Sequence, residues 1–224
     1  DYLTQAVEKR LYTTDRPIGF LLSGGLDSSL IASIASRYSD QPIRTFSIGF
    51  KDSPDLIHAK TVAEFLNSQH TQVIIDEDDI KQNLHDVVYA LETFDITTIR
   101  ASIPMYLLSR YISKHTDVRV IFSGEGSDEL FGGYLYFHDA PHEYAFQKET
   151  IRLCRELYKY DVLRGDRTTA RFGLELRVPF LDLTFSQFVL QLDPSWKFGT
   201  YRIEKEILRQ AFQGYLPKSI LDRQ

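Results

Sequence analysis

The chain has 224 residues and a formal net charge of -5 at pH 7. That length is sufficient for one sizeable α/β domain with its own core, and the negative charge excludes the basic field that binds a nucleic-acid backbone. No apolar run approaches the roughly 20 residues of a membrane helix. The single Cys154 has no partner for an internal disulfide, so we expect a cytoplasmic protein that binds neither nucleic acid nor membrane.

The first half of the chain alternates between helical and strand patterns. Apolar spacing predicts a first helix that contains Ala6 and Leu11 and ends before Pro17, then helices at about 28–38, 56–66, 80–92 and 103–115. Short runs of apolar and β-branched residues predict strands at 18–22, 43–50, 71–75 and 118–123. This alternation predicts a mainly parallel sheet with helices on both faces and right-handed crossovers.

The strand signal fades after Tyr134, and the remainder of the chain has helical spacing. We expect helices at about 144–157, 161–172, 183–192 and 203–212. The whole chain, 1–224, is therefore expected to be a single domain, with an α/β nucleotide-binding core at 1–140 and a helical annex at 141–224. Because it opens on Asp1 without an initiator Met, we also expect it to be a piece of a longer protein.

The first glycine-rich loop, Ser23-Gly24-Gly25-Leu26-Asp27-Ser28-Ser29, follows the predicted strand at 18–22. Adjacent glycines can turn backbone N–H groups inward, and the helix that follows presents its positive N-terminus, so the loop suits phosphate. It lacks the ending of a P-loop and the third glycine of a dinucleotide fingerprint. Asp27 would repel phosphate unless a divalent cation lay between them, so we infer Mg²⁺. A plain turn with Asp27 or Ser28 as helix cap is the structural alternative.

The second loop, Ser123-Gly124-Glu125-Gly126-Ser127-Asp128-Glu129, follows the predicted strand at 118–123. Three carboxylates between glycines at a strand end are poorly explained as a solvated turn. Ligands of open α/β sheets bind outside the carboxyl ends of the strands, near the point where the strand order reverses. If the two strands are neighbours, Asp27 and Asp128 can share one Mg²⁺-bound pyrophosphate.

These two loops resemble the pyrophosphate-binding motif and the second signature motif of the asparagine synthetase family. The resemblance extends to the stretches 50–56, 95–102, 132–138 and 173–182 and covers nearly the whole chain in order. It implies a fold of the adenine nucleotide alpha hydrolase-like, ATP-pyrophosphatase type with a C-terminal helical annex. It also implies ATP-dependent amidation of aspartate to asparagine through β-aspartyl-AMP, with ammonia as the nitrogen donor and with AMP and pyrophosphate as further products.

The resemblance assigns ATP contacts to both loops and to strand ends. The residues are Leu22, Ser23, Gly24, Gly25, Leu26, Asp27, Ser28, Ser29, Ile48, Ser123 and Gly124. The main chain at Leu22, Ile48, Ser123 and Gly124 is expected to hold the base and ribose. Glu125 is associated with formation of the adenylate, and Asp27 and Asp128 are expected to serve catalysis as Mg²⁺ ligands.

The same resemblance assigns the aspartate substrate to Thr98, Arg100, Glu129, Asp161 and Arg164. For Asp161 and Arg164 the alternative is a solvated i,i+3 ion pair worth only about 0.3–0.5 kcal/mol. Aspartate carries one ammonium and two carboxylates, so a site that offers both acids and an arginine matches it chemically. That match favours the substrate role.

The sequence departs from the family pattern in two places. Nothing in it resembles the N-terminal glutaminase domain of glutamine-dependent members, so ammonia is expected to come from such a domain in the parent chain or from a separate subunit. The resemblance also implies a Lys-Glu pair beyond Gln224, whose lysine acts at the phosphates, so we expect the chain to lack that cation unless Lys218 or Arg223 replaces it. Lys218, Arg223, His138 and Cys154 are interpreted as structural residues.

Two other functions remain open at this point. A relative of the same fold, similar to β-lactam synthetases, would activate a different carboxylate. A chain without the phosphate-binding lysine would be an impaired ATP-binding fragment. A homodimer is compatible with all three interpretations, and the sequence does not choose a quaternary state.

Overall fold

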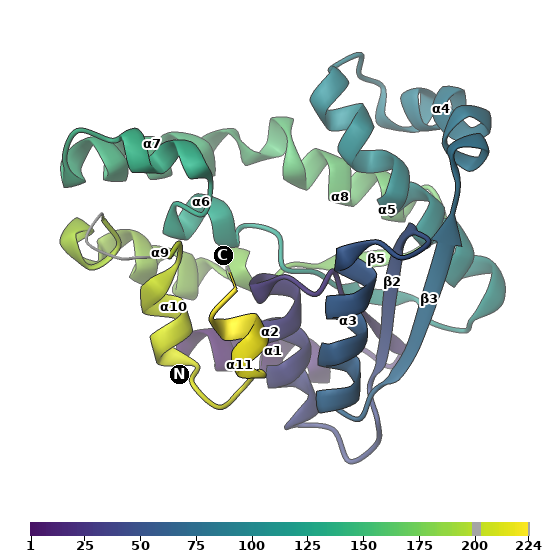
Figure 1. Ribbon diagram of the computed structural model, residues 1–224, viewed down its shortest axis with the longest axis horizontal. Helices are drawn as coiled ribbons and strands as arrows, with labels where there is room; N and C mark the ends of the chain where they lie inside the picture. The colour runs from purple at the N-terminus through teal and green to yellow at the C-terminus, as the bar shows by residue number, and fades with distance from the viewer. Residues whose placement is uncertain (199–202, 224) are drawn as a thin grey trace.

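The computed structural model describes residues 1–198 and 203–223. Its core contains a five-stranded sheet in the order β3-β2-β1-β4-β5, in which every pairing is parallel. Figure 1 labels β2, β3 and β5 of this sheet. The strands are β1 (Ile18–Leu21), β2 (Arg44–Phe50), β3 (Gln69–Ile75), β4 (Val120–Phe122) and β5 (Glu175–Arg177). The expected parallel sheet with helices on both faces is confirmed.

The strand order reverses between β1 and β4. The chain passes from β1 to β2 and β3 on one side and then returns to place β4 on the other side of β1. Phe20 pairs with Thr45 of β2 and with Phe122 of β4. The loops that follow β1 and β4 therefore leave the same edge of the sheet side by side, as the sequence predicts for neighbouring strands.

Helices cover both faces of the sheet. On one face lie α1 (Tyr2–Tyr12), α2 (Leu26–Ser36) and α3 (Pro54–Phe65), whose buried residues share a core with Phe20 and Phe122. On the other lies α5 (Ile96–His115), which packs with Phe46 and Ile121, while α4 (Glu77–Leu91) and α8 (Asp161–Ala170) pack against α5. The alternation of inward side chains along each strand supplies both cores.

The second half of the chain contributes to the sheet as well as to the annex. Its helices are α6 (Ser127–Phe131), α7 (Glu143–Glu156), α8, α9 (Leu183–Gln191), α10 (Glu206–Ala211) and α11 (Lys218–Leu221), with 3₁₀ segments at Leu135–Asp139, Leu157–Lys159, Pro179–Leu181 and Pro194–Trp196. The expectation of helices alone after Tyr134 is wrong, because β5 pairs with β4 at the edge of the sheet. A division at residue 140 therefore does not separate the sheet from the helices.

The remaining differences are small. α5 begins at Ile96 rather than near 103, because Asp95 caps it by accepting the Thr98 N–H at 2.7 Å, and Pro104 is accommodated inside the helix. α10 begins at Glu206 rather than 203. Within the residues described, no helix is long and apolar enough to cross a membrane.

Candidate active site

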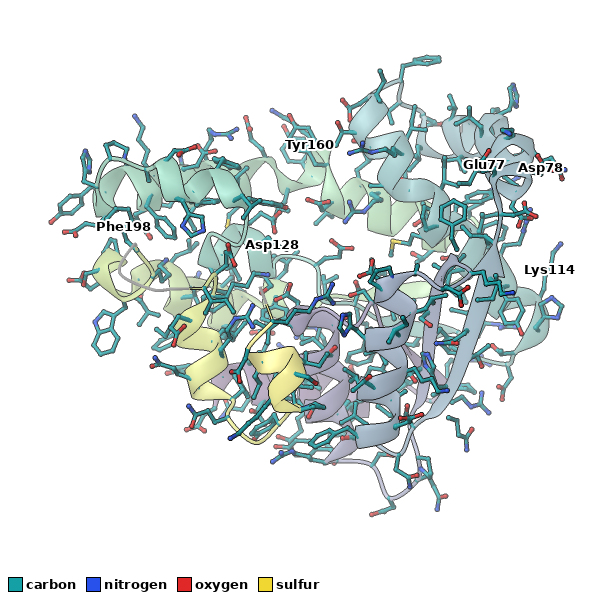
Figure 2. All side chains as sticks on the ribbon, viewed as in Figure 1. Glu77, Asp78, Lys114, Asp128, Tyr160 and Phe198 are labelled. Atoms are coloured by element: carbon teal, nitrogen blue, oxygen red, sulfur yellow. The ribbon has the colours of Figure 1, made fainter. Side chains whose placement is uncertain are left out.

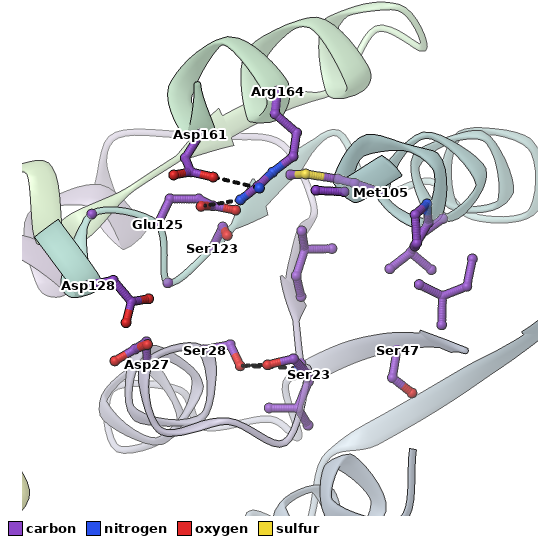
Figure 3. Close-up of a pocket in the computed structure, with 18 of the residues that line it drawn as sticks. Ser23, Asp27, Ser28, Ser47, Met105, Ser123, Glu125, Asp128, Asp161 and Arg164 are labelled. Atoms are coloured by element: carbon purple, nitrogen blue, oxygen red, sulfur yellow. Dashed lines mark hydrogen bonds and ion pairs between the residues drawn. The ribbon is translucent and has the colours of Figure 1, made fainter. Parts of the chain in front are cut away.

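A cavity of about 490 Å³ lies at the carboxyl edge of the sheet, beside the loops that follow β1 and β4 (Figure 3). Its apolar wall includes Phe46 of β2 and Met105 and Leu108 of α5. Its polar wall comes from the two loops and from α8, and its residues are Ser23, Asp27, Ser28, Ser123, Glu125, Asp128, Glu129, Asp161 and Arg164. An apolar side and a charged side suit a ligand with a ring and charged groups.

The two loops touch each other, and a glycine permits this approach. A Cβ added to Gly124 would lie 2.6 Å from the Ser28 nitrogen and 2.8 Å from the Asp27 carbonyl carbon, closer than real side chains come. The hydroxyl of Ser127 donates to Asp27 Oδ1 at 2.6 Å. The carboxylates of the two loops are thereby held near one another at the strand-order switch.

The first loop ends at the N-terminus of α2, which has Gly25 as its cap residue and no capping side chain. Ser23 and Ser28 join their hydroxyl oxygens at 2.9 Å, and Ser28 Oγ also accepts the Ser23 N–H at 3.1 Å. A helix N-terminus whose first amides have no side-chain partner favours a bound anion. The loop therefore has the chemistry that phosphate requires.

Lys205, which directly precedes α10, joins the two loops. Its Nζ lies 2.6 Å from Asp27 Oδ2 and 2.7 Å from Asp128 Oδ1, and its side chain is only 7% exposed. Gly133 leaves the room for this contact, because a Cβ there would lie 2.1 Å from Lys205 Cε. Burial alone would lower the pKa of Lys205, but Asp27 and Asp128 outweigh it and raise the pKa above its usual value. The lysine is thus held as a cation between two carboxylates.

Asp27 and Asp128 also match what Mg²⁺ requires. Burial and the neighbouring Asp27 raise the pKa of Asp128, although Lys205 acts in the opposite direction. No group of three or more His, Cys, Asp and Glu side chains within the described residues could hold a metal by itself. Two carboxylates that leave the other positions to phosphate oxygens and water are the usual protein contribution to a Mg²⁺–nucleotide site, so the residues fit this ion.

Figure 2 contrasts Asp128 with the acidic start of α4. Glu77 and Asp78 lie on the outside of the molecule, where their side chains are 81% and 78% exposed. Asp128, labelled just below α6 in Figure 2, lines the cavity, and its side chain is 36% exposed. The acidic start of α4 is therefore much more solvated than Asp128 at the cavity.

Arg164 of α8 connects Glu125 with Asp161. Its Nη2 lies 2.8 Å from Glu125 Oε2 and its Nη1 2.5 Å from Asp161 Oδ1, with all three side chains about four-fifths buried, at 18–21% exposure. Burial raises the pKa of Glu125 despite the nearby guanidinium. A solvated helix-surface pair is therefore the wrong interpretation of Asp161 and Arg164, because the pair is buried and shared with the second loop.

A second cavity of about 360 Å³ adjoins the first and shares Glu129, Tyr134, Asp161 and Arg164 with it. Thr98 lines only this second cavity. The Tyr134 hydroxyl donates to Glu129 and lies 3.3 Å from Asp161 Oδ2. Burial raises the pKa of Glu129 to about 7. Two acids, one arginine and one phenol thus surround the junction of the two cavities.

Comparison with known proteins decides the family. A family model described as asparagine synthase matches residues 1–152 and 140–224. The chain belongs to the asparagine synthase family. It is 53% identical to the glutamine-hydrolyzing asparagine synthetase of Homo sapiens over 97% of its own length and 40% of that protein. It is 51% identical to a probable glutamine-hydrolyzing asparagine synthetase of Acanthamoeba polyphaga mimivirus, over 99% and 40% of the two chains.

The chain spans about 40% of the length of these asparagine synthetases. Among solved structures, it resembles the NH3-dependent NAD synthetase of Campylobacter jejuni with a TM-score of 0.41 and 17% identity, over 74% of this chain and 77% of that one. A similar partial likeness, with a TM-score of 0.40 and 14% identity, links it to the NMN synthetase of Francisella tularensis over 84% and 91% of the two chains.

This member of the asparagine synthase family brings most of its predicted site residues to one place. Of the residues expected to contact ATP, Leu22, Ser23, Asp27, Ser28, Ile48, Ser123 and Gly124 line the first cavity. Leu26 and Ser29 instead lie in the core beneath the loop, and Gly24 and Gly25 form its turn without lining the cavity. Arg100 is exposed on α5 and lines neither cavity, so the structure does not place it with the other candidate aspartate ligands.

Sequence reasoning missed Lys205 and Tyr134. The chain was expected to lack a cation at this position, but Lys205, which the sequence analysis did not consider, lies between Asp27 and Asp128. In the sequence, Lys205 stands between two glutamates in a segment of helical spacing, which is typical of a solvated surface. Only the chain path that returns α10 to the first loop reveals its position.

Proposed function

We propose that this chain is the synthetase part of an enzyme that converts aspartate to asparagine at the expense of ATP. The observation that carries the proposal is the convergence of Asp27, Asp128 and Lys205 beside a cavity whose far end holds Glu129, Asp161 and Arg164. A phosphate-binding end and an amino-acid-binding end then lie in one continuous space. Membership of the asparagine synthase family supports the same reaction.

ATP is proposed to lie across the carboxyl edge of the sheet. Its base would rest against the apolar wall formed by Ile48, Met105 and Leu108, with main-chain contacts at Leu22 and Ser123. Its phosphates would meet the first loop and the N-terminus of α2. When bound, Mg²⁺ would be held by Asp27 and Asp128 and would neutralise charge on the phosphates.

Aspartate is proposed to bind where the two cavities meet. The carboxylates of Glu129 and Asp161 suit its ammonium group, and the guanidinium of Arg164 suits one of its carboxylates. Thr98 lines the same junction from α5. In this position the side-chain carboxylate of the substrate would point towards the ATP phosphates, with Glu125 beside the space between them.

The proposed reaction has two displacement steps. In the first, an oxygen of the aspartate β-carboxylate attacks the α-phosphorus, the bond to the bridging oxygen breaks, and pyrophosphate leaves with that electron pair. Lys205 would stabilise the charge that develops on the leaving group, because its ammonium is already fixed between the two loops. In the second, ammonia attacks the acyl carbon of β-aspartyl-AMP, AMP leaves, and the nitrogen loses a proton to give asparagine.

We further propose that the chain is a single domain and works with a glutaminase domain of the same parent chain. The names of its relatives, which are glutamine-hydrolyzing enzymes of greater length, support this arrangement. Ammonia supplied in solution should then replace glutamine for this part of the protein.

Incubation with ATP, Mg²⁺, ammonia and aspartate tests the proposal. Formation of asparagine and AMP in equal amounts is the expected result. If the intact protein makes AMP only when a carboxylate other than aspartate is present, the substrate assignment fails while the adenylating site stands.

A further inference from the structure

Lys205 adopts a backbone conformation that needs external support. Its φ is +58° and its ψ +31°, in the left-handed region that a side chain with a Cβ seldom occupies. Such a residue persists only where its surroundings fix it. The contacts of the neighbouring Glu204 identify part of what fixes it.

Glu204 is held at both its backbone and its side chain. Its carbonyl accepts a hydrogen bond from Arg209 Nε at 2.8 Å, and Arg209 also donates to the Leu221 carbonyl at 2.5 Å. Its carboxylate accepts from His138 Nε2 at 3.0 Å, and this bond lowers the pKa of Glu204. One end therefore ties to α10 and α11, and the other to the 3₁₀ segment that contains His138.

The 3₁₀ segment that contains His138 follows the second glycine-rich loop closely along the chain. α6 carries Asp128, and the chain then passes through Gly133 and Tyr134 directly into Leu135–Asp139. Lys205 Nζ meets Asp128 while its neighbour Glu204 meets His138. The adjacent residues Glu204 and Lys205 thus contact the stretch from Asp128 to His138 at both of its ends.

We propose that His138 is a positioning residue that acts through Glu204 to keep Lys205 between Asp27 and Asp128. His138 touches no part of the proposed substrate space, because it lines neither of the two cavities beside Arg164. With the His138 bond in place, the residue before Lys205 is fixed at both ends and the ammonium is directed to one location. This inference rests on the proposed function for its kinetic readout but not for its structural one.

A positioning role can be separated from a general contribution to stability. The His138 side chain is 53% exposed, and exposed pairs of this kind contribute little to the free energy of unfolding. Loss of the bond should therefore leave the melting temperature almost unchanged. Misplacement of a catalytic group by 1 Å can nevertheless cost about 100-fold in rate.

The test compares His138→Ala with His138→Gln in the intact protein, because the glutamine amide can donate to Glu204 from nearly the same position. His85→Ala is the matched control, since His85 is exposed on α4. We expect His138→Ala to lower kcat by about tenfold, with KM for aspartate within about twofold and faster amide exchange in 203–209. His138→Gln should restore most of both properties.

Amide exchange also tests the positioning role of His138 in a protein that has no enzymatic activity. If His138→Ala leaves exchange in 203–209 equal to that of His85→Ala, the inference is overturned, whether or not the protein makes asparagine. Unchanged kcat in an active protein overturns it as well. A loss of kcat that His138→Gln does not repair would contradict the role of the hydrogen bond to Glu204.

Discussion

At the scale of single residues, the site depends on opposite charges held close together. Asp27 and Asp128 repel one another, and the ammonium of Lys205 lies between them. In the proposed reaction the same cation would stabilise pyrophosphate as it leaves. Lys205 would therefore pair with two carboxylates in the free protein and stabilise negative charge in the proposed reaction.

Lys205→Met should separate these two roles. We expect kcat for asparagine formation to fall by about 100- to 1,000-fold, the usual cost of losing one preorganised group that stabilises developing charge. Two partly buried carboxylates would also lose their partner, so the melting temperature in the absence of Mg²⁺ should fall. Lys81→Met, on the exposed face of α4, is the control. An active Lys205→Met protein would remove the lysine from the proposed mechanism.

The sequence predicts the carboxylates of this site but not its cation. Asp27 and Asp128 belong to loops that follow recognisable strands, so local pattern and sheet topology together bring them to one edge. Lys205 belongs to a short segment far along the chain, and its inward direction depends on a left-handed backbone that no spacing of apolar residues encodes. Local sequence patterns therefore do not predict a site residue that comes from a distant segment of the chain.

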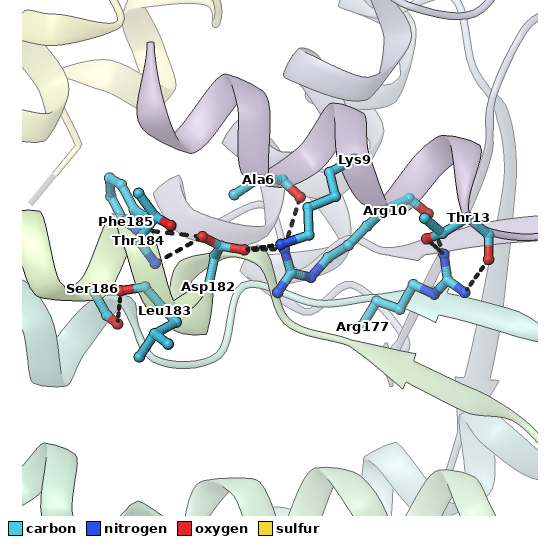
Figure 4. Close-up of polar contacts among 10 residues, drawn as sticks. All are labelled: Ala6, Lys9, Arg10, Thr13, Arg177, Asp182, Leu183, Thr184, Phe185 and Ser186. Carbon is cyan, nitrogen blue, oxygen red and sulfur yellow. Dashed lines mark hydrogen bonds and ion pairs between the residues drawn. The ribbon is translucent and has the colours of Figure 1, made fainter.

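At the scale of elements, α1 and the segment from β5 to α9 hold each other (Figure 4). Arg177 of β5 donates to the Arg10 carbonyl and to Thr13 Oγ1, the latter at 3.0 Å. Asp182 caps α9 by accepting from Thr184 N–H at 3.1 Å and pairs with Arg10 Nη1 at 2.8 Å. The Arg177 carbonyl in turn accepts the Ser123 N–H at 3.0 Å. Through these bonds α1 supports β5, and β5 in turn supports the loop that begins at Ser123.

Asp182→Asn tests this support through its pH dependence. Burial would raise the pKa of Asp182, but Arg10 and Lys9 outweigh it and lower the pKa to about 2. A carboxylate with a lowered pKa stabilises the fold fully above its unfolded value near 4, and that contribution is lost as the pH falls towards 2. We expect urea unfolding to show a loss of about 2 kcal/mol for Asp182→Asn at pH 7.

The same variant should differ much less from the original protein near pH 2. Asp78→Asn, at an exposed position, is the control at both pH values. An equal loss for Asp182→Asn at pH 7 and pH 2 would show that the ion pairs with α1 do not stabilise the fold.

The sequence predicts the elements whose residues carry a clear apolar pattern. The four strands of the first half and the longer helices follow from periodicity. The sequence does not predict β5, Glu175–Arg177, because two of its three residues are charged and none is fully buried, whereas the equally short β4 is wholly apolar and buried. Its place is set by hydrogen bonds to β4 rather than by its own composition.

At the scale of the whole molecule, sheet and annex share one core. Phe185 of α9, Leu208 of α10 and Ile220 of α11 lie in the same buried cluster as Leu30 of α2 and Phe122 of β4. The C-terminal helices therefore cover apolar surface of the α/β half. We therefore propose that residues 1–140 and 141–224 form one folding unit, as expected from the sequence, and that residue 140 marks only a change of sequence pattern.

A fragment of residues 1–140 should consequently fail to fold cooperatively. It would expose the apolar face that α9, α10 and α11 cover and would lose β5 from the sheet edge. We expect it to bind a hydrophobic dye and to lack near-ultraviolet circular dichroism, as loosely packed states do. A sharp thermal transition in this fragment would show that the first 140 residues are an independent domain.

The most direct measurement of the central claim is the exchange of labelled pyrophosphate into ATP by the intact protein with Mg²⁺ and aspartate. Exchange requires only the first displacement, so it reports the adenylating site without ammonia or a glutaminase. We predict exchange that depends on aspartate, is retained in Asp52→Asn, and is lost in Asp27→Asn with the fold preserved. Exchange of equal rate in Asp27→Asn, or none in the unmodified protein, would contradict the assignment of the two carboxylate loops to ATP.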